Sequence, residues 1–142
     1  MEDKYNLQRF LSAQGQSMDG IIHELSQGQK VGHWMWYVFP QVKGLGRSST
    51  SELYAIQSKD EAISYLNHPV LGPRLLECTK AVNAHENLTA KSIFGHPDYL
   101  KFRSCMTLFE KIAKSNSPFS EALDRFFGGE PDKCTISLLE TL

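Results

Sequence analysis

The sequence predicts an all-α protein: a compact, single-domain, multihelical fold with short connections. Apolar residues recur every three or four positions along most of the chain, which is the spacing of one face of a helix. Serine, threonine or aspartate precedes several of these segments, as is typical of helix starts. The chain has 142 residues, a length that suits one domain with one core. We therefore treat residues 1–142 as a single helical domain.

Two short helices are predicted at the N-terminus. The first runs from about Asp3 to Gln14, where apolar residues recur at roughly helical spacing. A break is expected over 15–17, because glycine weakens helix continuity. The second helix carries the apolar residues between Met18 and Leu25 and ends near Gln27.

The later helices are identified by their starts and stops. Ser49–Glu52 and Ser58–Glu61 both have the S-x-x-E pattern of a capping box. The predicted later helices begin at about Ser49, Ser58, Leu71, Thr89, Pro97, Ser117 and Asp132. The longest pattern, 97–113, has a broad apolar face and is the predicted core helix. Only Trp34–Val38 has a pattern that would also suit a strand.

Composition and charge exclude several classes of protein. The chain is 41% hydrophobic and 22% charged, with a net charge of −1, which indicates a folded globular protein. No basic block is present to follow a phosphate backbone, so no nucleic-acid partner is expected. The charged N-terminus lacks the apolar core of a signal peptide, and no apolar run approaches the ~20 residues of a membrane span. A cytoplasmic protein without a membrane partner is expected.

The cysteines and histidines show no metal-binding pattern. The three cysteines, Cys78, Cys105 and Cys134, are far apart and form no C-x-x-C pair. Such spacing favours reduced thiols over a disulfide framework or a zinc site. The five histidines are scattered and no H-E-x-x-H motif exists. We therefore expect neither a metal nor another cofactor.

The segment 32–51, GHWMWYVFPQVKGLGRSSTS, has the most unusual composition in the chain. Its aromatic part has two interpretations. Trp34 and Trp36 could fill a core between helices, or they could form the wall of a pocket for a planar ligand such as a nucleobase. Polar groups at both ends of the aromatic run, His33 and Gln41, favour the pocket.

The second part of this segment suggests an anion site. Gly46 permits close approach of a ligand, and the serines that follow lie at a helix start, where free N–H groups favour an anion. Plain helix capping is the alternative. Lys101 and Asp98 lie in the first turn of the long helix, which is the predicted opposite wall. The candidate ligand-binding residues are Trp34, Trp36, Gln41, Gly46, Arg47, Ser48, Ser49, Ser51 and Lys101.

No catalytic motif is complete. His33, Glu52 and Asp98 are the candidate acid–base groups. A serine and a histidine could act together only if the fold brought them into contact, and no G-x-S-x-G elbow is present. The sequence therefore leaves open whether the protein is an enzyme.

Four blocks of the sequence together resemble a known family. They are GHWMWYVFPQ with the following GLG, YAIQSKDEAISYLNHPVLGPRL, FGHPDYLKFRSCMTLF and LDRFFGGEPD. These blocks are similar to the DUF1810 family, which includes the Rv1873-like proteins of mycobacteria. The resemblance extends from about Leu7 to Leu139 and implies an all-helical fold in a small cytoplasmic protein. It implies no activity, because the family has no known function.

Three functions are consistent with these observations. The first hypothesis is a domain that binds a small aromatic or nucleotide-like molecule bearing an anionic group. A second is a hydrolase or glycosidase acting on a nucleoside-like substrate in the same pocket. A third is a protein–protein interaction module that uses the aromatic segment as an exposed patch. The residues do not indicate an oligomeric state.

Overall fold

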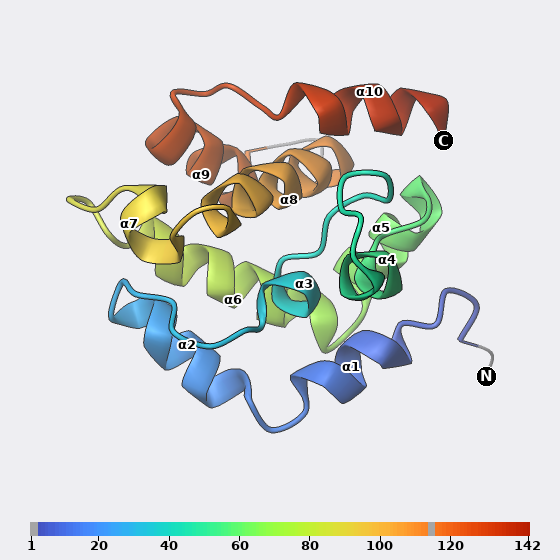
Figure 1. Ribbon diagram of the computed structural model, residues 1–142, viewed down its shortest axis with the longest axis horizontal. Helices are drawn as coiled ribbons and strands as arrows, with labels where there is room; N and C mark the ends of the chain where they lie inside the picture. Colours follow the sequence, from blue (N-terminus) through green and yellow to red (C-terminus); the bar gives the residue numbers. More distant parts are fainter. Residues whose placement is uncertain (1–2, 114–115) are drawn as a thin grey trace.

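Helices account for all the regular structure in the described part of the chain (Figure 1). The computed structural model describes residues 3–113 and 116–142. Among these residues no strand is present, and the single β interaction is an isolated parallel bridge between Val42 and Ile56. The all-α prediction is therefore confirmed. The helices are α1 (Gln8–Gln14), α2 (Met18–Ser26), α3 (Met35–Val38), α4 (Ser49–Tyr54), α5 (Lys59–Asn67), α6 (Leu71–Asn83), α7 (Ala90–Phe94), α8 (Asp98–Ala113), α9 (Pro118–Phe127) and α10 (Lys133–Thr141).

Helix α8 is the central element, as its long apolar face predicts. It packs against α9, α7, α10 and α5, and Figure 1 shows α9 and α10 together on one side of the molecule, with α1 and α2 at the other. Every residue of α8 from Phe102 to Phe109 is buried except Arg103. A second group forms around α6, which packs against α9, α2 and α5.

One continuous apolar cluster joins these helices. It extends from Leu7, before α1, to Leu139 in α10. Three aromatic rings pack together within it: Phe39 lies edge-on to Phe102 at 5.1 Å between ring centroids, and Phe94 stacks on Phe102 at 4.7 Å. Aromatic pairs at such separations stabilise a core beyond their buried area. The segment that follows α3 is thereby anchored to α8.

Most of the predicted helix caps are confirmed. Each cap side chain accepts a hydrogen bond from a backbone N–H three residues ahead, which satisfies one free donor of the first turn. These pairs are Ser58 with Glu61 at 3.0 Å, Thr89 with Ser92 at 3.0 Å, Ser117 with Ser120 at 3.3 Å, and Asp132 with Thr135 at 2.9 Å. The cap of α4 is one residue earlier than predicted. Ser48, with extended backbone, accepts from the N–H of Ser51 at 3.1 Å.

Two further sequence predictions differ from the structure. The possible strand at 34–38 is a single helical turn, α3, because helical spacing directs both Met35 and Val38 into the core. The first helix begins at Gln8 rather than at Asp3. The Asp3 carboxylate instead accepts hydrogen bonds from the N–H groups of Leu7 and Gln8, at 2.7 and 2.8 Å, and so caps α1 from outside it.

None of the helices within 3–113 and 116–142 combines the length and apolar character that a membrane crossing requires.

Candidate functional site

The aromatic segment is divided between the core and the surface. Trp34 and Phe39 are 3% and 1% exposed and belong to the apolar cluster. Trp36 and Tyr37 are half-buried, and Tyr37 packs against the edge of that cluster. The core interpretation therefore holds for Trp34 and Phe39, and the pocket interpretation stays a prediction for Trp36.

Trp34 is held by Glu24, a residue of α2. The indole Nε1–H donates to Oε1 of Glu24 at 2.9 Å, and the same oxygen accepts from the backbone N–H groups of Val31 and Gly32 at 2.7 and 3.1 Å. Burial alone would raise the pKa of Glu24. The hydrogen bonds from Val31, Gly32 and Trp34 outweigh this effect, and the pKa lies below its ordinary value. Glu24 is therefore an anchor for the loop that leads into α3.

Asp98 and Lys101 are already used in ion pairs. Asp98 binds Nζ of Lys30 at 2.9 Å and Nζ of Lys101 at 3.2 Å. Both lysines also lie over tryptophan rings: Lys30 is 5.2 Å from the ring centroid of Trp34, and Lys101 is 4.9 Å from that of Trp36. Such contacts stabilise a cation over an aromatic face. This group ties the 30–36 segment to the start of α8.

The predicted anion site at the start of α4 consists of capping contacts. Ser48 Oγ accepts from the N–H of Ser51 and donates to Ser51 Oγ at 2.9 Å. Helix α4 has only six residues, so its dipole is small. Gly46 is explained by packing, because a Cβ atom there would lie 2.3 Å from Cβ of Ser51. Capping and close packing therefore account for these residues without a ligand.

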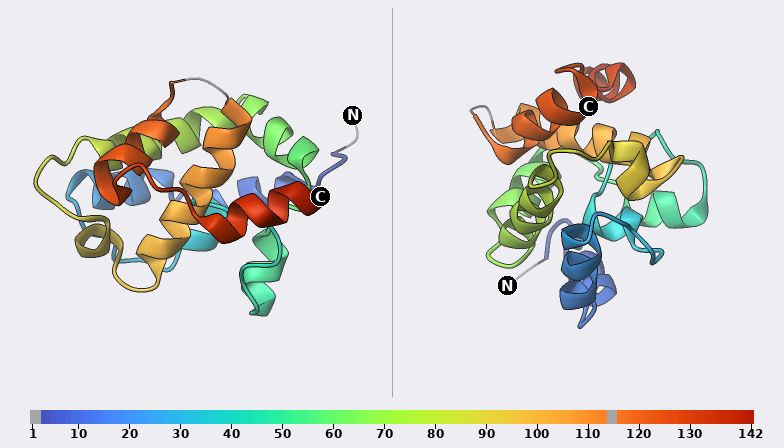
Figure 2. Two further views of the ribbon diagram at one scale, coloured as in Figure 1. Left: turned by 90° about the horizontal axis from the view of Figure 1, so that it is seen from above. Right: turned by 90° about the vertical axis from the view of Figure 1, so that its left-hand side faces the viewer.

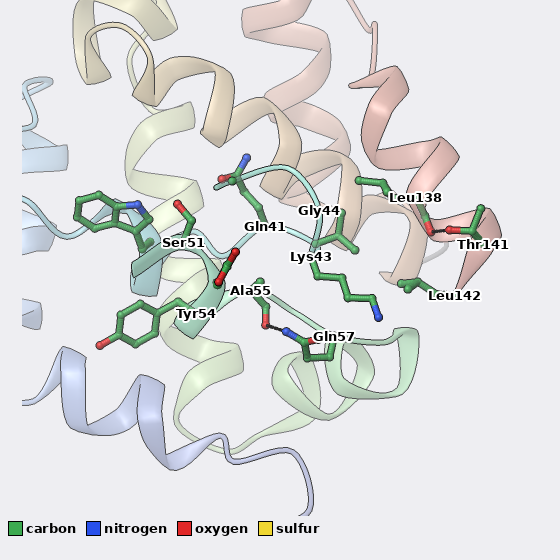
Figure 3. A pocket seen from close by; sticks show the side chains of 14 residues that line it. Gln41, Lys43, Gly44, Ser51, Tyr54, Ala55, Gln57, Leu138, Thr141 and Leu142 are labelled. Carbon is green, nitrogen blue, oxygen red and sulfur yellow. Dashed lines mark hydrogen bonds between the residues drawn. The ribbon is translucent and has the colours of Figure 1, made fainter. Parts of the chain in front are cut away.

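A cleft of about 480 Å³ lies beside this turn, and we call it the α4–α10 cleft. Figure 3 shows Gln41, Ser51 and Tyr54 from the α3–α4 region, with Leu138 of α10 and Leu142, directly after α10, across the cleft. Its lining consists of Trp36, Gln41, Val42, Lys43, Gly44, Gly46, Ser51, Glu52, Tyr54, Ala55, Gln57, Leu138, Thr141 and Leu142.

The bridge between Val42 and Ile56 directs polar side chains into this cleft. The N–H of Ile56 donates to the carbonyl of Gln41 at 2.8 Å, and the N–H of Lys43 donates to the carbonyl of Ile56 at 2.9 Å. Val42 and Ile56 are almost fully buried. Because side chains alternate along extended backbone, the neighbours of these two residues face away from the core. Gln41, Lys43 and Gln57 therefore line the cleft.

Several polar groups of the cleft have no protein partner. Within the described residues, no hydrogen bond or ion pair involves the amide of Gln41, the ammonium of Lys43, the carboxylate of Glu52 or the indole N–H of Trp36. The carboxylates of Glu24 and Asp98, by contrast, are bound by protein groups. The cleft is thus the place where unpaired polar groups of this region meet.

The structure brings some predicted site residues together and separates others. Those that line the cleft are Trp36, Gln41, Gly46, Ser51 and Glu52. Those outside its lining are His33, Trp34, Arg47, Ser48, Ser49, Asp98 and Lys101. Of the acid–base candidates, Glu52 alone lines the cleft, and His33 is exposed to solvent. No group of three potential metal ligands occurs within 3–113 and 116–142.

Sequence reasoning missed several residues of the cleft. Lys43 and Gln57 could have been found from their position beside buried residues of extended segments, Val42 and Ile56. Leu138 and Leu142 could not, because α10 lies far away in the chain and has no unusual composition.

The fold and the site define an all-helical protein with a partly polar cleft. The chain belongs to the family described as "Protein of unknown function (DUF1810)", whose family model matches residues 4–139. It is similar to the conserved hypothetical protein Rv1873 from Mycobacterium tuberculosis, known from a crystal structure. The two share 45% sequence identity over 97% of this chain and 99% of that chain, with a TM-score of 0.95. Comparison with curated proteins gives no match. The resemblance seen in the sequence is confirmed, and it assigns no activity.

Proposed function

We propose that this protein is a small-molecule-binding domain whose ligand occupies the α4–α10 cleft. One observation carries the proposal: polar side chains without protein partners gather at a concave surface with apolar walls. The volume of about 480 Å³ lies within the ~300–1,000 Å³ typical of ligand sites. The carboxylates of Glu24 and Asp98, by contrast, are bound by protein groups.

The lining indicates the chemistry of the ligand. Gln41 presents an unpaired amide, which both donates and accepts hydrogen bonds and so matches the edge of a planar heterocycle. The amide nitrogen of Gln57 already donates to the carbonyl of Ala55 at 3.3 Å, which leaves its oxygen as an acceptor. Leu138 and Leu142 supply an apolar wall. Lys43 is the one cation in the lining and would receive an anionic group of the ligand. An aromatic or nucleotide-like compound with a phosphate or carboxylate fits this set.

The position of the contacting indole and that of the anionic group differ from the hypothesis drawn from the sequence. The indole in contact with ligand is that of Trp36, since Trp34 is buried in the core. The anionic group lies at Lys43, because the start of α4 is occupied by the capping contacts of Ser48 and Ser51. Arg47 lies outside the cleft lining and is exposed.

Binding is favoured over hydrolysis by the number of carboxylates. Most glycosidases use two carboxyl groups that flank the scissile bond. Among the residues that line the cleft, Glu52 is the one carboxylate. Asp98, the other candidate, is engaged by Lys30 and Lys101.

Titration with nucleoside monophosphates and the matching nucleosides tests the proposal. Binding is followed by amide chemical shifts and by tryptophan fluorescence, which Trp36→Phe should render unresponsive. Lys43→Ala should weaken the binding of a nucleoside monophosphate by up to about fivefold and leave the affinity for the nucleoside unchanged. Gln41→Leu should weaken both by about two- to tenfold.

Arg47→Ala is the matched control, because it removes a nearby exposed cation outside the cleft. It should leave both affinities unchanged. If Arg47→Ala weakens the monophosphate while Lys43→Ala does not, the anion binds at the start of α4 and the cleft is not the site. If neither the nucleotides nor aromatic carboxylates shift the amide signals of the cleft in the folded protein, the proposal fails.

A further inference from the structure

A second concave surface lies between α5, α8 and α10. Its volume is about 930 Å³, and we call it the α5–α8–α10 groove. Helix α10 lies at the outer edge of the molecule and against α8 (Figure 2). Ile136, Leu139 and Glu140 of α10 border this groove, whereas other residues of the same helix line the α4–α10 cleft.

The apolar part of the groove lining is mostly aliphatic. Phe119 and Leu139 are almost fully buried and belong to the apolar cluster, so they form the floor. Ile63 is 42% exposed. The apolar side chains that remain partly exposed along the walls include Ile63, Leu66, Ile112 and Ile136. Covering exposed aliphatic surface of this kind with an apolar ligand removes it from water and lowers the free energy.

Two uncharged polar residues, Asn67 and Ser117, also line the groove. Ser117, one of its polar residues, is the cap of α9, and its N–H and Oγ both bind Ser120, at 3.0 and 3.3 Å. Asn67, at the end of α5, is the other uncharged polar residue of the lining, and within the described residues its side-chain amide makes no hydrogen bond. Apart from Asn67, the uncharged lining of the groove offers its occupant mainly apolar contacts.

Charges at the border of the groove favour an anion. Lys59 extends from α5 and Lys111 from α8, so the two cations come from different walls. Glu140 of α10 is the one acidic residue in the lining. Within the described residues none of the three has an ion-pair partner. The border therefore carries a net positive charge that is available to a ligand.

We propose that this groove binds a single-chain amphiphile with an anionic head, such as a medium-chain fatty carboxylate. The alkyl chain lies along Ile63, Leu66 and Ile136, and the carboxylate lies beside Lys59 and Lys111. This site is separate from the α4–α10 cleft, and the proposal does not depend on what that cleft binds.

Calorimetric titration with octanoate, decanoate and dodecanoate, each below its micelle concentration, tests the apolar part. Each added pair of methylenes should tighten binding by up to about fifteenfold while the groove still covers them. Ile63→Asn should weaken the binding of dodecanoate. Leu53→Asn is the matched control, because Leu53 is also exposed but lies outside the groove, and it should have no effect.

Charge variants test recognition of the head group. Lys59→Glu and Lys111→Glu should each weaken dodecanoate by about two- to fivefold and strengthen dodecylamine. Glu140→Lys should strengthen dodecanoate, and Lys91→Glu, on α7 and outside the groove, should change nothing. The proposal is overturned if dodecanol binds as tightly as dodecanoate, if the charge variants and Ile63→Asn all bind like the unmodified protein, or if only anionic lipid vesicles and no free carboxylate bind.

Discussion

Replacing Glu24 with glutamine should destabilise the protein where Trp34 enters the core. One carboxylate oxygen accepts three hydrogen bonds, from Val31, Gly32 and the indole of Trp34. Glutamine keeps an acceptor oxygen but loses the charge. Hydrogen bonds to a charged group contribute roughly 1.5–3 kcal/mol, against roughly 0.5–1.5 kcal/mol for neutral pairs. We expect the free energy of unfolding to fall by about 1–2 kcal/mol.

Glu24→Ala should cost more, about 2–4 kcal/mol, because it leaves the buried indole N–H of Trp34 without an acceptor. Denaturant unfolding at neutral pH, followed by tryptophan fluorescence, measures both losses. Glu77→Gln is the control: Glu77 is exposed, and its replacement should change the free energy of unfolding by less than about 0.5 kcal/mol.

The pH dependence of the Glu24→Gln loss has a defined sign. The pKa of Glu24 is lower in the folded protein than its ordinary value of 4.5, because its three hydrogen bonds outweigh the effect of burial. The folded state therefore binds this proton less readily than the unfolded state does. The stabilisation is complete above the ordinary value and is lost as pH falls through the lower, folded value.

The difference between unmodified protein and Glu24→Gln should accordingly be largest near neutral pH and should shrink in acid. Two results would refute the reasoning. One is a Glu24→Gln loss no larger than that of Glu77→Gln at neutral pH. The other is a loss that stays constant through the acid range, which would mean that the charge of Glu24 does not hold the loop.

Two further predictions concern packing and thiol reactivity. Gly46→Ala should lower the free energy of unfolding by about 1–3 kcal/mol, because the new methyl would lie 2.3 Å from a side-chain carbon of α4. Gly20→Ala, with open space around a helical position, should instead raise it by about 0.5–1 kcal/mol; thermal and denaturant unfolding compare the two, and equal effects would contradict the packing argument. With an aromatic disulfide reagent at neutral pH, Cys134 should react quickly because it is exposed, whereas Cys78 and Cys105 should react only after unfolding. Burial raises the pKa of the Cys78 thiol to about 12 and that of Cys105 well above its ordinary value, so fast reaction of more than one thiol in the native protein would show this burial to be wrong.

Local signals predicted most of the helices correctly. A cap such as Thr89 acts on a backbone group three residues away, so its effect can be read without knowledge of the rest of the fold. The apolar face of α8 was visible for the same reason, since helical spacing is a local property. The start of α1 was misplaced because Asp3 caps the helix from several residues before it.

The candidate site was predictable only in part. Trp36, Gln41 and Glu52 line the cleft. The first two belong to the segment 32–51, which has an unusual composition, and Glu52 directly follows it. Trp34 belongs to the same segment and lies in the core, because it precedes α3 whereas Trp36 lies two residues further on, on a different side of the helix. No alternation or composition signal distinguishes these two tryptophans.

The sequence by itself determined the all-α class, most helix starts, the central helix and the family, because these depend on contacts between near neighbours or on recurring residue blocks. Only the tertiary structure decided which polar side chains have a hydrogen-bond or ion-pair partner and which have none. Asp98 meets Lys30 across 68 positions of sequence, and Leu138 and Leu142 close the cleft from the far end of the chain. Such pairings depend on how helices pack in three dimensions, and that packing separates the structural tryptophan, Trp34, from the candidate ligand contact, Trp36.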